Sequence, residues 1–308
     1  MCRHLAYLGP PVPVGDILTR GPHSLRTQSW APRDMRGGGT INADGFGVAW
    51  WIPAPAAAHL VAARALGPGL GDSGADRAES VTAAAEQPTV SRYRNAAPIW
   101  TDPAVAEVLP QLHSSAVLAA VRSATAGLPV EQAACAPFTH GRWAFSHNGA
   151  IPDWRDALTA VAAQFDSPSL LDAESLTDSA LLWVILRSLL ENKTPPSGAD
   201  IEPEVALTAA IRTVFDPEIA LTAVVRAVYE LSPRARLNLL LGDGETVWAT
   251  TWQHALSVLV ADDFAVVASE PYDDDPRWQS IADRQLVVVR PGRLTVKPLD
   301  FENGRTSR

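Results

Sequence analysis

The order of apolar segments along the chain is the feature that most restricts its fold. Short strand-like runs come first, a block with helical periodicity occupies the middle, and strand-like runs return after Pro233. A doubly wound α/β fold needs strands and helices in alternation, so this order favours an α+β protein in which sheets and helices form separate layers. The length of 308 residues corresponds to about two average domains or one large domain.

The expected elements follow from periodicity and from breaker residues. We expect strands over 5–8, 46–52, 116–121, 143–147, 237–241, 247–252, 256–260, 265–268 and 285–290, with a hairpin turn at Gly242-Asp243-Gly244. We expect helices over 153–165, 177–191 and the two parts of 204–231, which Asp216-Pro217 divides. Residues 54–88, rich in Ala, Gly and Pro, and the Pro-containing 192–203 are expected to be loop insertions.

The charge balance and the cysteine content restrict the partners. The chain has 25 Lys and Arg against 34 Asp and Glu, a formal charge of −9, which disfavours nucleic acid. No apolar run approaches the roughly 20 residues of a spanning helix, and the N-terminus is too short in its apolar part for a signal peptide. Two cysteines, Cys2 and Cys135, are too few for a secreted disulfide scaffold, although one bridge between them is an alternative. These features predict a cytoplasmic protein without a nucleic-acid or membrane partner.

Cys2 is the candidate nucleophile. Removal of Met1 places a thiol and a free α-amine on one residue. The unperturbed pKa of an α-amine is about 7.7–8.0 and that of a thiol about 8.5, so the amine can accept the thiol proton near neutral pH. The alternative is that Cys2 is only a small apolar residue at the start of a strand.

Polar residues at strand and helix ends are candidates for substrate binding. Arg122 follows an apolar run, and its forked guanidinium can bind a carboxylate through two hydrogen bonds. Asn148 and Gly149 offer a side-chain amide and a backbone N–H suited to an oxyanion. Asp178 can pair with an ammonium group. Each has a purely structural alternative. Arg122 could form a surface salt bridge, Asn148 and Gly149 could form an ordinary turn, and Asp178 could be an acidic residue in the first turn of a helix.

Together these motifs resemble class II glutamine amidotransferase domains and, within that group, the amidohydrolases of ergothioneine biosynthesis. The resemblance to the group rests on five motifs that occur in the expected order: Met1-Cys2-Arg3-His4-Leu5, Asn42-Ala43-Asp44-Gly45-Phe46-Gly47, Arg122-Ser123-Ala124-Thr125-Ala126-Gly127, Phe145-Ser146-His147-Asn148-Gly149 and Thr177-Asp178-Ser179. The narrower resemblance rests on 28–32, 98–100, 237–241 and 269–276. One departure is that Ser123 and Ala126 stand where many amidotransferases have Trp and His.

The resemblance implies a single domain over 1–308 with an N-terminal-nucleophile fold, a four-layer αββα sandwich of mainly antiparallel sheets. It implies hydrolysis of a γ-glutamyl amide, with γ-glutamyl-hercynylcysteine sulfoxide as substrate and glutamate as a product. By position, Cys2 would attack the γ-carbonyl and Asn148 with the Gly149 N–H would hold the oxyanion. Arg122 and Thr125 would bind the α-carboxylate, and Asp178 would bind the α-ammonium group.

The implied substrate carries a trimethylammonium group, which binds well against aromatic faces. Trp30 and Trp100, two of ten Trp residues, are the candidates for that contact, and the alternative is that they are core or rim residues. No motif predicts a metal or nucleotide, so we expect no cofactor, and the acidic run 273–275 is expected to be a solvated loop. Two other functions stay open: a glutaminase that supplies ammonia to a partner synthase, and a non-catalytic binding protein with the same fold.

Overall fold

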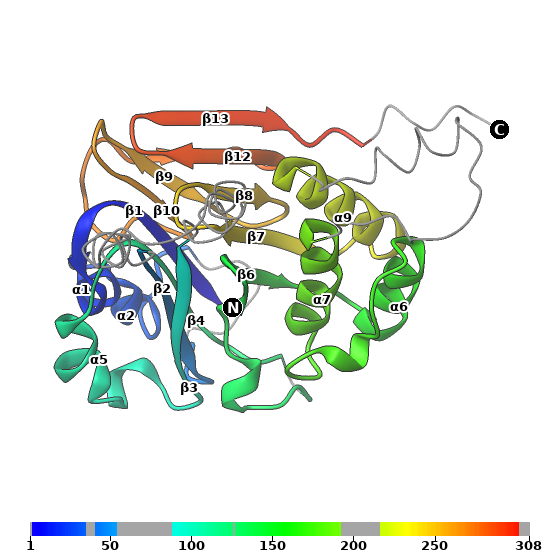
Figure 1. Cartoon of the computed structure of the whole chain (residues 1–308), viewed down its shortest axis with the longest axis horizontal. Helices are drawn as coiled ribbons and strands as arrows, with labels where there is room; N and C mark the ends of the chain where they lie inside the picture. Colours follow the sequence, from blue (N-terminus) through cyan, green and yellow to red (C-terminus); the bar gives the residue numbers. More distant parts are fainter. Residues whose placement is uncertain (1, 35–40, 54–87, 126, 192–215, 302–308) are drawn as a thin grey trace, which may run out of the picture.

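The computed structural model describes residues 2–34, 41–53, 88–125, 127–191 and 216–301. Its strands form two stacked sheets, and all strand pairs within them are antiparallel (Figure 1). The seven-stranded sheet has the order β11-β9-β10-β1-β4-β2-β3, and the six-stranded sheet has the order β13-β12-β8-β7-β6-β5. The first sheet contains β1 (Arg3–Pro13), β2 (Phe46–Ile52), β3 (Thr89–Asn95), β4 (His113–Val121), β9 (Ser257–Val260), β10 (Ala265–Ala268) and β11 (Gln279–Ser280). The second contains β5 (Phe138–His140), β6 (Trp143–Ala150), β7 (Arg236–Gly242), β8 (Val247–Thr251), β12 (Gln285–Arg290) and β13 (Arg293–Pro298).

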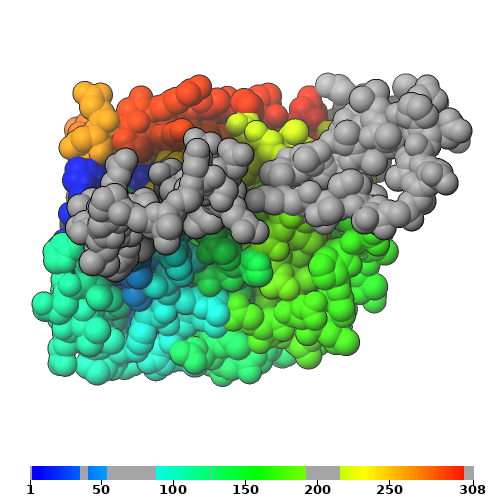
Figure 2. Space-filling view, in the orientation of Figure 1, coloured from blue at the N-terminus to red at the C-terminus, as the bar shows by residue number. Residues whose placement is uncertain are grey.

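Helices cover the outer face of each sheet (Figure 1). The first sheet is covered by short helices, and the second by longer ones. The short helices are α1 (Val14–Thr19), α2 (Leu25–Gln28) and α5 (Ala104–Glu107), together with the 3-10 turns η1 (Ile99–Thr101) and η2 (Leu109–Gln111). The longer helices are α6 (Trp154–Gln164), α7 (Asp178–Glu191) and α9 (Pro217–Leu231), and two further 3-10 turns are η3 (Gln132–Ala134) and η4 (Leu170–Asp172). Figure 2 shows β12 and β13 in red along one edge of the molecule.

Three apolar layers hold the sandwich together, and β1 shows how its sequence serves two of them. Successive side chains of a strand point to opposite faces. Ala6 and Leu8 pack between the two sheets, while Leu5 and Tyr7 pack against the short helices. The third layer lies between the second sheet and the longer helices. The arrangement is therefore helix, sheet, sheet, helix, which confirms the predicted αββα sandwich.

All nine predicted strands and the helices over 153–165 and 177–191 are confirmed within a few residues. Helix α9 begins at Pro217, and the Asp216 side chain caps it by accepting the Glu218 N–H at 2.8 Å. The strand predicted at 5–8 extends to Pro13, with a register shift between Leu8 and Val12. The predicted insertions at 54–88 and 192–203 lie outside the described residues, except for Pro88. The first of the two helices predicted within 204–231 also lies outside them.

Sequence reasoning missed β3, β5, β11 and β13 and the short helices. All four of these strands lie at sheet edges: β11 and β3 end the first sheet, and β13 and β5 end the second. Edge strands expose much of their surface and carry polar residues, so they lack the apolar runs by which strands are recognised. Within the described ranges no helix is long and apolar enough to cross a membrane.

Candidate active site

Cys2 lies directly before β1, a central strand of the first sheet, so the N-terminal end of the chain is brought into the middle of the sandwich (Figure 1). Its thiol points to the carbonyl oxygen of Ser123, with an Sγ–O distance of 3.7 Å. Cys2 borders a cavity of about 30 Å³, which we call the nucleophile cavity. The polar residues lining it are Cys2, Arg122, Ser146, His147 and Ser179, and the others are Ala120, Val121, Ala134, Ala136 and Phe138.

Arg122 directly follows β4, which confirms its predicted position after a strand, and it lines the nucleophile cavity together with Cys2. Its backbone N–H donates to Gly45 O at 2.8 Å, and one guanidinium nitrogen donates to Pro129 O at 2.8 Å. The Arg122 side chain is therefore held in place while it lines the cavity. Thr125, predicted to help bind the same carboxylate, is exposed and does not line the nucleophile cavity.

Asn148 and Gly149 lie on β6 and pair with Asn238 and Leu237 of β7. A Cβ atom at Gly149 would lie 1.8 Å from Arg236 O, so the close approach of the two strands requires glycine. The Asn148 side chain is fully buried and its Nδ2 donates to Ser269 Oγ at 2.9 Å. Neither residue lines the nucleophile cavity, but both directly follow His147, which does.

Asp178 begins α7, and Ser179, the next residue, lines the nucleophile cavity. The Asp178 carboxylate accepts two backbone N–H groups, from Ser179 to Oδ1 at 2.8 Å and from Ile151 to Oδ2 at 3.1 Å. Thr177 caps the helix as predicted, because its Oγ1 accepts the Ala180 N–H at 3.2 Å. The carboxylate is thus buried and oriented at the edge of the site.

His147 orients the Ser179 hydroxyl, a relationship that sequence reasoning missed. Its Nε2 lies 2.8 Å from Arg236 O, which can only accept, so Nε2 carries the proton. Nδ1 lies 3.0 Å from Ser179 Oγ, and the same hydroxyl lies 3.3 Å from Asp178 Oδ1. The alternation of β6 sends His147 to the side of α7, and the Phe145-Ser146-His147-Asn148-Gly149 motif was the available signal.

His4 faces the second sheet, where its Nδ1 lies 3.2 Å from Ser146 Oγ. Burial, the largest cause, and charge repulsion from His254, His147 and Arg3 together lower the pKa of His4 to about 3. The imidazole is therefore neutral at physiological pH. The available signal in the sequence was strand alternation, because His4 stands two positions after Cys2 and side chains two positions apart on a strand face the same side.

Arg3 and Glu270 form a buried ion pair beside the nucleophile, also missed from the sequence. Arg3 Nε lies 3.4 Å from Glu270 Oε1, and another Arg3 nitrogen donates to Cys2 O at 3.0 Å. Glu270 Oε2 accepts the backbone N–H groups of Arg33 and Asp34 at 2.9 and 2.8 Å. The pair connects the Cys2 backbone with the turn at residues 33–34.

Trp30 and Trp100 are brought together but not into the nucleophile cavity. Their rings meet edge to face with centroids 5.6 Å apart, and Trp30 is 43% exposed. Trp100 lines a separate hollow of about 200 Å³ together with Arg26 and Asp102. The two residues therefore form an aromatic corner with exposed ring surface.

Cys135 is buried, and both Cys135 and Cys2 are free thiols. The alternative of a disulfide bridge between them is therefore wrong. Burial raises the pKa of Cys135 to about 11, and the thiol contacts Glu131 O and Asn95 O at 3.4 and 3.5 Å. Cys135 is therefore uncharged at neutral pH and unreactive as a nucleophile. Cys2, which is partly exposed, is the thiol that can react.

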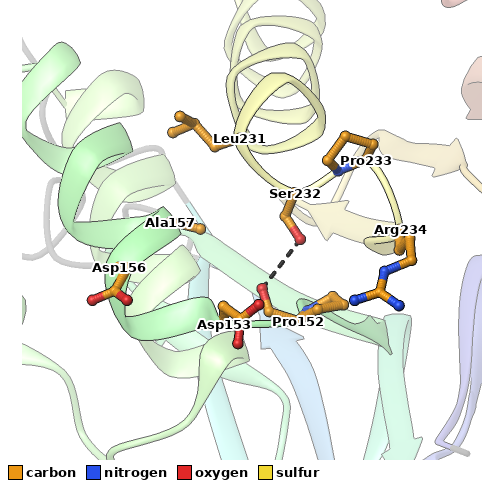
Figure 3. Close-up of a pocket in the computed structure, with 8 residues that line it drawn as sticks. All are labelled: Pro152, Asp153, Asp156, Ala157, Leu231, Ser232, Pro233 and Arg234. Carbon is orange, nitrogen blue, oxygen red and sulfur yellow. Dashed lines mark hydrogen bonds between the residues drawn. The ribbon is translucent and has the colours of Figure 1, made fainter.

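A larger hollow of about 290 Å³ lies where α9 ends and α6 begins (Figure 3). The Ser232 hydroxyl donates to Pro152 O at 3.1 Å across it, and Asp153, Asp156 and Arg234 line it. None of the predicted site residues lines this hollow. Of the predicted site residues, Cys2 and Arg122 line the smaller nucleophile cavity.

Two antiparallel sheets between helical layers, with a cysteine at the tip of a central strand, define an N-terminal-nucleophile fold of the class II glutamine amidotransferase type. Solved structures support this class. A glutamine aminotransferase class-II domain protein from Silicibacter pomeroyi matches with a TM-score of 0.50 at 20% identity, over 97% of this chain and 100% of that one. Glutamine phosphoribosylpyrophosphate amidotransferase from Bacillus subtilis matches with a TM-score of 0.56 at 11% identity, over 98% of this chain and 50% of that one.

Sequence relatives define the family more narrowly. The chain is 38% identical over 299 residues to γ-glutamyl-hercynylcysteine sulfoxide hydrolase of Mycolicibacterium smegmatis, covering 97% of this chain and 100% of the relative. It is 36% identical over 304 residues to the hydrolase of the same name from Mycobacterium tuberculosis, covering 99% of both chains. No protein-family model matches the chain. The chain belongs to the family of γ-glutamyl-hercynylcysteine sulfoxide hydrolases.

Proposed function

We propose that this protein hydrolyses the γ-glutamyl amide bond of γ-glutamyl-hercynylcysteine sulfoxide and releases glutamate, a step of ergothioneine biosynthesis. The observation that carries the proposal is that the Cys2 thiol and the Arg122 guanidinium line the same cavity. A γ-glutamyl head group has a carboxylate for the arginine and a carbonyl for the thiol. Full-length similarity to relatives that carry this name supports the choice of substrate.

The proposed reaction has two steps on Cys2. After loss of Met1, the Cys2 α-amine takes the thiol proton, and the sulfur attacks the γ-carbonyl carbon. The C–N bond breaks as the amine product leaves with that proton, and a glutamyl thioester stays on Cys2. Water then attacks the thioester, giving one proton back to the α-amine-thiol pair and producing free glutamate.

The head group has a proposed binding set of opposite charges. Arg122, helped by Thr125, binds the α-carboxylate, and Asp178 binds the α-ammonium group. The Asn148 amide and the Gly149 N–H stabilise the oxyanion of the tetrahedral intermediate. A cavity of about 30 Å³ holds about one water molecule, so the lining residues must separate when substrate enters.

The amine half of the substrate is proposed to contact Trp30 and Trp100. Their rings form a corner with an exposed face, and a trimethylammonium group bound against such a face gains about 0.5–2 kcal/mol. Asp102, buried at the adjacent hollow, adds negative charge beside Trp100. Changing each tryptophan to Leu should raise KM for the trimethylated substrate but leave KM for glutamine unchanged.

The test measures glutamate release from γ-glutamyl-hercynylcysteine sulfoxide and from glutamine by the wild-type protein and by Cys2→Ala. We expect the sulfoxide to be the better substrate and Cys2→Ala to be inactive with unchanged thermal unfolding. Intact-mass spectrometry of active protein should show that Met1 is absent. Full activity of Cys2→Ala, or Met1 retained on fully active protein, would overturn the mechanism.

Two rival functions give different results in the same assays. A glutaminase that feeds a partner synthase, favoured by the 26% identity to the probable glutamine amidotransferase DUG3 of Saccharomyces cerevisiae, would turn over glutamine faster than the sulfoxide. A non-catalytic binding protein would release no glutamate, and its Cys2 would resist iodoacetamide at neutral pH. Buried Cys135 provides an internal reference, since only Cys2 should be labelled in the folded enzyme.

A further inference from the structure

Ser269 lies directly after β10 and is joined to β1 by two hydrogen bonds. The Ser269 N–H donates to His4 O at 2.9 Å, and the His4 N–H donates to Ser269 Oγ at 3.0 Å. Ser269 is 2% exposed, so these bonds are formed in the interior. The hydroxyl oxygen therefore has a set position two residues from Cys2 along the first strand.

The same hydroxyl faces the Asn148 side chain across the two sheets. Asn148 Nδ2 lies 2.9 Å from Ser269 Oγ, while Asn148 Oδ1 is buried and has no hydrogen-bond partner. Leaving a buried carbonyl oxygen without a donor is costly. In this orientation, one of the two amide protons is also directed at Ser269 and is not available to a substrate.

A half-turn of the terminal amide pairs the carbonyl oxygen and leaves both amide protons for a ligand oxygen to accept. Asn148 Oδ1 then lies against Ser269 Oγ, and the Ser269 hydroxyl, which already accepts from the His4 N–H, donates its proton to Oδ1. Nδ2 takes the former place of Oδ1, with both protons directed away from Ser269. Ser146 projects from the same face of β6 as Asn148 and lines the nucleophile cavity, so Asn148 lies on a face of β6 that borders this cavity.

We propose that Ser269 is a positioning residue for the hydrolysis: its hydroxyl donates to Asn148 Oδ1 and thereby directs Nδ2 toward the developing oxyanion. The proposal deepens the proposed function and rests on the oxyanion role of Asn148 stated there. Ser269 touches no reacting atom. Its contribution is to select one of two amide orientations before the substrate arrives, so that no reorientation is needed in the transition state.

The test is a double-mutant cycle on kcat for glutamate release from γ-glutamyl-hercynylcysteine sulfoxide. Asn148→Ala should lower kcat by about 10²–10³. Ser269→Ala should lower kcat by about tenfold with KM unchanged, because one oriented hydrogen bond is lost. The double variant should be no slower than Asn148→Ala, since Ser269 acts only through Asn148.

Three further variants separate positioning from structural loss. Ser269→Thr keeps the hydroxyl and should restore kcat, whereas Ser269→Cys keeps the volume with a weak donor and should be as slow as Ser269→Ala. The cysteine variant replaces the alanine variant if the latter does not fold. Ser114→Ala, which removes another buried serine hydroxyl bonded to Trp51 O at 2.8 Å, should keep wild-type kcat.

The outcomes distinguish this inference from the proposed function. Wild-type kcat in Ser269→Ala, or losses that multiply in the double variant, would overturn the role of Ser269 while the oxyanion role of Asn148 stands. Wild-type kcat in Asn148→Ala would overturn both roles. Loss of activity in Asn148→Ala, together with a double variant equal to it, supports both.

Discussion

Asp178 Oδ2 accepts the Ile151 N–H at 3.1 Å, which ties the first residue of α7 to the residue directly after β6. Oδ1 accepts the Ser179 N–H at 2.8 Å, so both carboxylate oxygens are oriented by backbone donors. Within the described part of the chain, Asp178 forms no ion pair. A negative charge is thus held next to the cavity-lining Ser179 without a protein cation to neutralise it, as the proposed ammonium contact requires.

Asp178→Asn should raise KM for the γ-glutamyl substrate by about 10–100-fold, because a hydrogen bond to a charged group contributes about 1.5–3 kcal/mol. The amide keeps the shape of the side chain but loses the charge. Steady-state kinetics provide the measurement, with Asp156→Asn on the exposed side of α6 as the matched control. An unchanged KM would remove Asp178 from ammonium binding.

Arg122→Lys should also raise KM by about tenfold or more, because lysine keeps the charge but cannot form two parallel hydrogen bonds to one carboxylate. It should also lose the bond to Pro129 O. A γ-glutamyl analogue lacking the α-carboxylate should bind both proteins equally. Arg155→Lys, on an exposed position of α6, is the control, and equal KM values in Arg122→Lys and wild type would contradict the assignment.

The buried neutral imidazole of His4 predicts acid sensitivity. Its pKa is about 3 in the folded protein and about 6.5 in the unfolded chain, so below pH 6.5 the unfolded state binds a proton that the folded state does not. The free energy of unfolding should therefore fall by about 2 kcal/mol between pH 7 and pH 5 through this group.

Urea unfolding at pH 7, 6 and 5 measures this effect. His4→Gln should lose less stability over that range than the wild type, because glutamine does not titrate. His113→Gln, which changes an exposed histidine of β4, should follow the wild-type curve. Identical pH dependence in His4→Gln and wild type would show that His4 does not control it.

Gly149→Ala should destabilise the protein by about 3 kcal/mol and abolish turnover, because the added Cβ would lie 1.8 Å from Arg236 O and force β6 and β7 apart. Gly141→Ala is the comparison. It has no atom within 4 Å of the added Cβ but has a φ of +56°, so we expect a loss of only about 1 kcal/mol. Thermal unfolding distinguishes a steric clash from backbone strain.

Local patterns in the sequence determined much of this protein. The apolar runs at 46–52 and 265–268 match β2 and β10 residue for residue, because most of their residues are buried on both faces of the sheet and the runs are therefore continuously apolar. The candidate residue Cys2 was recognised from its position directly after Met1, and Arg122 from its position after an apolar strand. The residue types of Arg122 and Asp178 made them candidates for binding a carboxylate and an ammonium group, and the resemblance to the family assigned them to one zwitterionic head group.

Only the tertiary structure decided which of these residues meet. Ser269 and Asn148 are 121 positions apart, and Arg3 and Glu270 are 267 apart, yet each pair is in contact inside the sandwich. Strand register and the stacking of two sheets bring them together, and neither is encoded in a local pattern. The sequence by itself determined the buried strands, the longer helices and the candidate nucleophile, whereas sheet packing decided the hydrogen bonds around that nucleophile, because they depend on the alignment of strands distant in the chain.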